Sequence, residues 1–101
     1  STVFEPRLLQ MRGSRALRVS NTPLTAESLN EGDVFVLDTG NLLMQWQGRS
    51  SGSRERAKAL QVTETIRESE RGGSAKLKVF NQGDEPVEFW LLLGGTPHSP
   101  G

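Results

Sequence analysis

The chain has 101 residues with twelve basic and twelve acidic side chains, so its formal net charge is zero and its pI lies near 6.5. This balance argues against nucleic acid as a partner, which requires a basic surface. The absence of cysteine excludes disulfides and thiolate metal sites, and it is typical of a reducing compartment such as the cytoplasm. No apolar run approaches the roughly 20 residues of a membrane span. We also expect no signal peptide.

The length allows one domain with its own core. We expect that domain to span residues 1–101, with the core at about 7–95 and a tail or linker at 96–101. In the first half of the chain, turn residues separate runs rich in apolar and β-branched side chains, which is typical of strands. We predict four of them, as two hairpin-like pairs, at residues 7–11, 16–19, 34–37 and 42–46.

A long amphipathic helix is predicted from Ser53 to about Glu70, because this stretch lacks Gly and Pro and repeats apolar residues at helical spacing. Ser51 or Ser53 is expected to cap its first amides, and the glycines at 72–73 are expected to end it.

Residues 77–80 then form a further predicted strand, followed by a short helix with Pro86 in its first turn and the glycines at 94–95 after its end. The order of elements predicts an α+β domain. Its mostly antiparallel sheet of about five strands is packed between one long and one short helix.

Three segments carry a resemblance to a known family in both their order and their spacing. They are the run NEGDVFVLD at residues 30–38, Trp46-Gln47-Gly48, and the helix start RERAKA at 54–59. Together they resemble the gelsolin-like (ADF-like) repeat, and the resemblance extends over about residues 7–95. Residues 6–10 and 70–72 are most similar to the second domain of severin, fragmin, gelsolin and the villins.

The resemblance implies a calcium-regulated, actin-binding domain of a cytoplasmic, cytoskeletal protein that severs or caps filaments. Such a domain binds the filament side and guides a neighbouring gelsolin-like domain, so severing itself would lie elsewhere in the protein. We expect no enzymatic activity, because no nucleophile, base and orienting group can be assembled from the sequence. His98 is the only histidine and is assigned no role.

The resemblance also implies a calcium site made by the Gly32 carbonyl and the Asp33 and Glu55 carboxylates. These are the hard oxygen ligands of which Ca²⁺ takes six to eight. Family members receive a further acidic ligand from the segment after the domain, whereas no acid follows Glu88 here. We therefore expect calcium to bind more weakly here than in the intact protein, with water filling the remaining positions. Without the resemblance, Gly32-Asp33 is an ordinary turn pair and Glu55 an ordinary first-turn acid.

Basic residues gather in two places despite the zero net charge, and the resemblance implies that both contact the acidic surface of actin. They lie on the first hairpin (Arg12, Arg15, Arg18) and at the helix start (Arg54, Arg56, Lys58). Arg15 and Arg56 match the family's contact positions most directly. The alternative for each of them is a simply solvated side chain.

Two other functions stay open at this point. One is an interaction domain of a flightless- or supervillin-type scaffold with weakened actin binding. The other, ranked last, is a phosphoinositide-binding module, because residues 1–6 hold no Lys or Arg and include Glu5. Trp46 and Trp90 are expected to be packing residues. Secreted family members have a disulfide at the positions held here by Val34 and Gln47, which favours an intracellular form.

Overall fold

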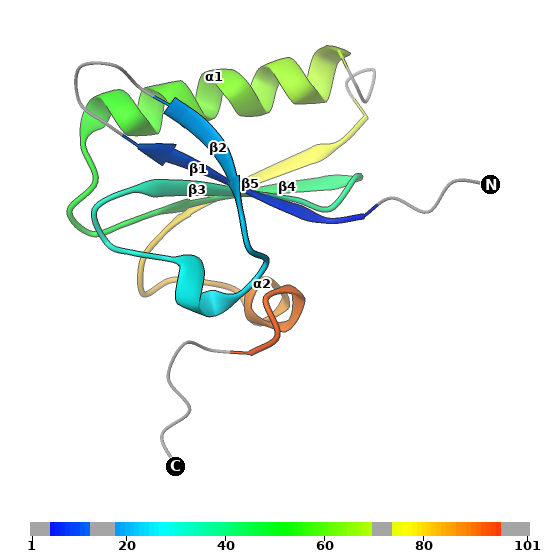
Figure 1. The fold of residues 1–101 in the computed structure, drawn as a ribbon. Helices are drawn as coiled ribbons and strands as arrows, with labels where there is room; N and C mark the ends of the chain where they lie inside the picture. The colour runs from blue at the N-terminus through cyan, green and yellow to red at the C-terminus, as the bar shows by residue number, and fades with distance from the viewer. Residues whose placement is uncertain (1–4, 13–17, 70–73, 96–101) are drawn as a thin grey trace.

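A computed structural model describes residues 5–12, 18–69 and 74–95. Its sheet has the strand order β2-β1-β3-β4-β5, with α1 on one face and η1 and α2 on the other (Figure 1). The elements are β1 (Arg7–Arg12), β2 (Arg18–Thr22), the 3₁₀ helix η1 (Ala26–Ser28), β3 (Val34–Asp38), β4 (Leu42–Gln47), α1 (Ser53–Ser69), β5 (Lys76–Asn81) and α2 (Val87–Leu92). The predicted α+β class and the five-stranded sheet are confirmed.

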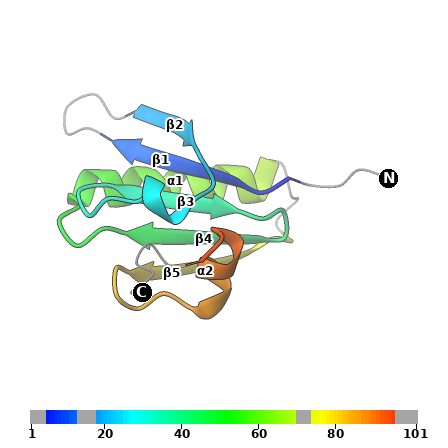
Figure 2. The same ribbon diagram turned by 60° about the horizontal axis from the view of Figure 1, so that its bottom comes forward.

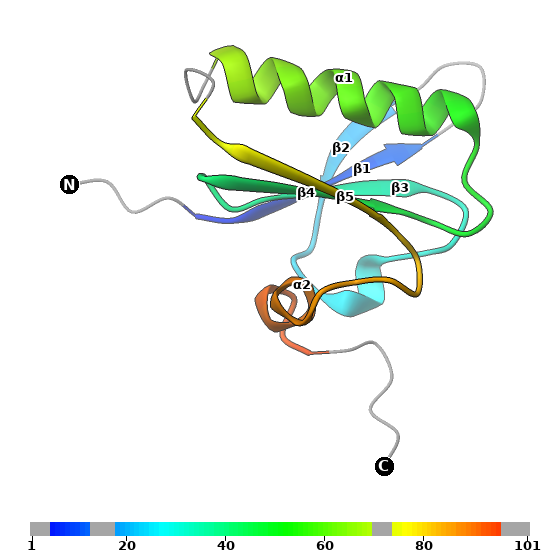
Figure 3. The same ribbon diagram turned by 180° about the vertical axis from the view of Figure 1, so that it is seen from behind.

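Three of the four strand pairings are antiparallel, and β4 with β5 is parallel. Parallel neighbours need a long crossover, which α1 supplies because it lies between these strands in the sequence. Seen from behind, α1 covers one face of the sheet while the chain after β5 leads to α2 on the other (Figure 3).

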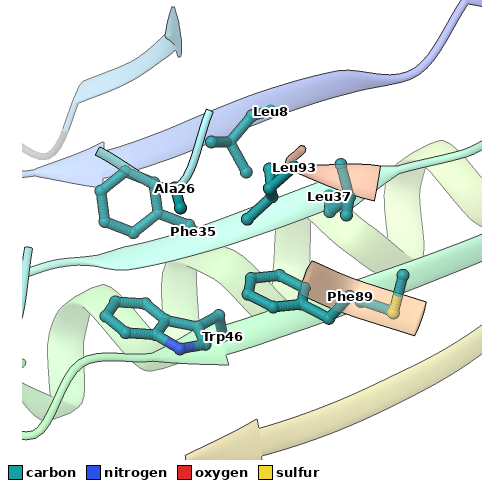
Figure 4. Packing of buried hydrophobic residues seen from close by; sticks show 8 residues of the cluster. Leu8, Ala26, Phe35, Leu37, Trp46, Phe89 and Leu93 are labelled. Atoms are coloured by element: carbon teal, nitrogen blue, oxygen red, sulfur yellow. The ribbon is translucent and has the colours of Figure 1, made fainter. Parts of the chain in front are cut away.

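Both faces of the sheet are buried at its central strands, and alternation along the strands divides the core into two layers. Under α1 lie Leu9, Met11, Val34, Val36, Leu43, Ala59, Ile66 and Ala75. On the other face lie Leu8, Ala26, Phe35, Leu37, Met44, Trp46, Phe89 and Leu93 (Figure 4). Every residue of β3 is buried, because this central strand is covered from both sides. The predicted packing role of Trp46 is confirmed, since its side chain is only 2% exposed.

Helix α1 confirms the predicted long helix, but the predicted serine cap is wrong. Gly52 holds the cap position: its carbonyl accepts the first helical bond from the Arg56 amide at 3.1 Å. The Gly52 amide donates in turn to Oε1 of Glu55 at 2.8 Å, which is half of a capping box. The Ser51 hydroxyl does not cap the helix: it donates to the Gly48 carbonyl at 2.7 Å and accepts from Nε of Arg56 at 3.0 Å. The glycines at 72–73 lie outside the described residues.

The end of α2 was predicted correctly, and its start was not. The amides of Gly95 and Gly94 donate to the carbonyls of Trp90 and Leu91, at 2.8 and 3.2 Å. This is a Schellman motif, and the positive φ of Gly94, the residue after the cap, permits it. Pro86, expected in the first turn, has an extended backbone with ψ 156° and precedes the helix at the cap.

The hairpin and the loop after it also differ from the prediction. The second strand runs over Arg18–Thr22 rather than 16–19, and residues 16 and 17 lie outside the described part. Pairing with β1 continues as far as Thr22, opposite Leu8, and Pro23 follows with no amide to donate. The short helix η1 lies in a segment that its turn-forming residues had marked only as a loop.

Candidate metal centre and basic surface

The turn before β3 is organised by the side chain of Asn30. Its Oδ1 accepts the Gly32 amide at 3.0 Å, and its Nδ2 donates to Oδ2 of Asp33 at 3.0 Å. Nε2 of Gln10, on β1, donates to the same Asp33 oxygen at 2.8 Å. Two amide groups therefore hold the Asp33 carboxylate at the start of β3.

The chain that leads from β4 into α1 is bonded directly to this turn. The Gly48 amide donates to the Asp33 carbonyl at 3.0 Å, and the Ser50 amide donates to the Glu31 carbonyl at 2.7 Å. Glu55 follows in the first turn of α1. The fold thus brings the predicted ligands Gly32 and Asp33 to the same end of the sheet as Glu55, although 22 positions separate the two carboxylates in the sequence.

Both predicted carboxylates are nearly buried, with Asp33 7% and Glu55 9% exposed. Each uses one oxygen locally, Oδ2 for Gln10 and Asn30 and Oε1 for the Gly52 amide. Among the described residues, none donates a hydrogen bond to the other oxygen of either carboxylate. Nor do three His, Cys, Asp or Glu side chains come together anywhere in that part of the chain. A cation held here would have to take backbone carbonyls and water as well, which suits Ca²⁺.

Gln10 and Asn30 are positioning residues that the sequence did not reveal. Asn30 lies within the quoted NEGDVFVLD run, and its spacing of three from Asp33 is a detectable signal of a side-chain turn. Gln10 is 23 positions away from Asp33, and only the pairing of β1 with β3 brings the two together.

On the hairpin, Arg12 and Arg18 are directly opposite each other in the pairing of β1 with β2, and both are exposed. Like charges directly opposite each other destabilise a strand pair, so the two arginines do not contribute to the stability of the hairpin. Arg15 lies outside the described residues.

At the start of α1, Arg54 is exposed and Lys58 is half-buried. Nε of Arg56 donates to the Ser51 hydroxyl at 3.0 Å, so this half-buried side chain helps to fix the loop before the helix. The outer face of α1 carries a shallow hollow of about 500 Å³, lined by Arg54, Ala57, Lys58 and Gln61. The end of β1, the beginning of β2 and the start of α1 lie at the same end of the domain (Figures 1 and 2).

Comparison with known proteins identifies the family. The gelsolin repeat matches residues 15–90. The chain is 42% identical over 94 residues to gelsolin from Gallus gallus, and 38% identical over 91 residues to macrophage-capping protein from Mus musculus. It therefore belongs to the gelsolin-repeat family. The alignments cover 93% and 90% of this chain but only 12% and 26% of those two proteins, so the chain corresponds to a small part of each.

The fold also resembles a solved structure, the crystal structure of the Thorarchaeota 2DGel3 protein in complex with rabbit actin. The TM-score is 0.79 at 24% identity, and the match covers 96% of this chain and 48% of that one. At this identity the likeness shows a shared fold. In the described part of the chain, no helix combines the length and the apolar character that crossing a membrane requires.

Proposed function

We propose that this domain binds the side of the actin filament through the hairpin and the first half of α1. Family membership supports the proposal, together with the names of the relatives and the actin complex of the fold neighbour. The observation that carries it is the gathering of exposed cations at one end of a chain whose net charge is zero. In this role the domain would act in the cytoplasm on the actin cytoskeleton.

The distribution of charge along α1 favours its first half as the contact. Arg54 and Lys58 lie beside the hollow on the outer face, whereas the only acid in this half, Glu55, is buried and occupied with the helix cap. The acids Glu64 and Glu68 lie in the second half. The first half thus presents positive charge to solvent, which suits an acidic partner and would speed the encounter with it.

We further propose that calcium binds between the 30–33 turn and the start of α1. Its protein ligands would be the Gly32 carbonyl and one oxygen each from Asp33 and Glu55, with water completing the shell. Since Glu55 belongs to the helix that carries Arg54 and Lys58, a bound ion would hold the start of α1 against the turn. Calcium would thereby order the actin-binding surface. This is the regulation that the family resemblance implies.

Reversing two charges on α1 tests the actin surface. The variant Arg54→Glu/Lys58→Glu is expected to bind filaments at least about tenfold more weakly in co-sedimentation, because each change replaces attraction to an acidic surface by repulsion. The matched control, Lys76→Glu/Lys78→Glu, makes the same charge change on the edge strand β5 and is expected to bind like the unaltered domain.

Equal losses in the two variants would mean that α1 is not the contact and that only overall charge matters. An unaltered domain that stays in the supernatant would refute actin binding, and the scaffold function would then be favoured.

A further inference from the structure

A cleft lies on the face of the sheet opposite α1. It has a volume of about 550 Å³ and is bounded by η1 with the loop after it, the end of β4, and the chain from β5 into α2. Both tryptophans of the sequence line it, together with Leu29 and Ala26. None of its lining residues belongs to the proposed actin contact on α1 and the hairpin, and α1 covers the opposite face of the sheet (Figures 1 and 3).

Hydrogen bonds hold the polar wall of the cleft in place. Nε1 of Trp46 donates to Oε2 of Glu85 at 2.7 Å, and the Gly83 amide donates to the same oxygen at 3.0 Å. The Arg49 amide donates to Oε1 of Gln82 at 2.8 Å, which joins the loop after β4 to the loop after β5. The cleft is therefore already formed before anything binds, as small binding sites usually are.

The apolar lining continues onto the outer surface of α2. Val87 and Leu91 are one helical turn apart and are 73% and 72% exposed, the two most exposed large apolar side chains in the described part of the chain. Trp90, which lines the cleft, is three positions from Val87 and adjoins the same helix face. An exposed apolar strip beside a cleft is typical of an interaction site.

The charges around the cleft are mainly negative. Two of its lining residues, Glu31 and Glu85, are acidic, and one, Arg49, is basic. The exposed acids Glu27 and Asp84 are sequence neighbours of lining residues. We propose that the cleft binds a basic polypeptide segment that packs large apolar side chains against Trp90 and Leu29. Lys or Arg in that segment would pair with the acidic rim, and its apolar side chains would cover Val87 and Leu91.

A short amphipathic peptide made only of leucine and lysine is a suitable probe. It contains no tryptophan, so the fluorescence of Trp46 and Trp90, both in the cleft, reports its binding directly. The titration is done in EDTA, which keeps it independent of calcium. We expect a saturable shift in tryptophan emission with the leucine–lysine peptide, and none with oligolysine or with a leucine–glutamate peptide.

Charge reversal locates the binding. The variant Glu27→Lys/Glu31→Lys is expected to bind the peptide about tenfold more weakly. The matched control Glu64→Lys/Glu68→Lys on α1 is expected to bind it with unchanged affinity. Val87→Ser/Leu91→Ser, at exposed positions where the cost to folding is small, is expected to weaken binding as well.

The proposal is overturned if the leucine–lysine peptide fails to bind or if oligolysine produces the same emission shift. It is also overturned if the two charge-reversal variants lose the same amount of affinity for the peptide. The variant Glu27→Lys/Glu31→Lys is expected to co-sediment with filaments like the unaltered domain. The peptide site and the actin surface are therefore tested independently of each other.

Discussion

Replacing Gly48 by alanine is expected to destabilise the domain by about 3 kcal/mol. A Cβ at this buried position would lie 2.5 Å from the Glu31 carbonyl oxygen and 2.6 Å from that of Asp33. Both are backbone atoms, and both accept hydrogen bonds from the 48–50 segment, so relief of the clash would pull that segment away from the turn. The free energy of unfolding from urea titration measures the effect.

The matched control is Gly32→Ala in the same turn. A Cβ there meets only Oδ1 of Asn30, at 3.4 Å, and the backbone at Gly32 does not have a positive φ. Its stability is expected to change by less than about 1 kcal/mol. Similar losses in both variants would contradict the view that close backbone contact, rather than a general need for glycine, determines position 48.

Replacing Asp33 by asparagine is expected to abolish stabilisation by calcium. If the ion binds as proposed, calcium at about 100 times its Kd stabilises the unaltered domain by about 2.7 kcal/mol, which raises the Tm by roughly 10 °C or more. Asparagine keeps an oxygen that can accept from Gln10 and Asn30, so the ion-free domain is expected to stay folded. Calorimetric titration, with thermal unfolding in calcium and in EDTA, measures both effects.

Glu31→Gln is the control, because it removes an exposed carboxylate from the same turn without touching the proposed ligands. Its response to calcium is expected to match that of the unaltered domain. Equal responses from all three proteins would show that Asp33 is not a ligand. If calcium neither binds to nor stabilises the unaltered domain, the proposed calcium site in this chain is refuted.

Local residue patterns were sufficient to predict most of the helices and strands. The Gly- and Pro-free stretch after Ser53 predicted α1 to within a residue or two, and the glycines at 94–95 predicted the end of α2. The apolar run at 34–37 predicted a buried strand, which β3 is. Helix ends and buried strands depend on residues that are close together in the chain, so they can be predicted from a single sequence. The NEGDVFVLD run and its spacing to the helix start were enough to indicate the family.

The sequence by itself therefore determined the order of the strands and of the two α-helices, the family, and which acids and bases are available for a site. Only the tertiary structure decided how these groups are held and which surfaces they share. It placed Gly52 at the helix cap, where its amide donates to Glu55, and it brought Gln10 to Asp33 across 23 positions. It also placed both tryptophans in one cleft. The physical reason is that these contacts join residues far apart in the chain, and strand pairing and packing choose such partners, whereas local propensity does not.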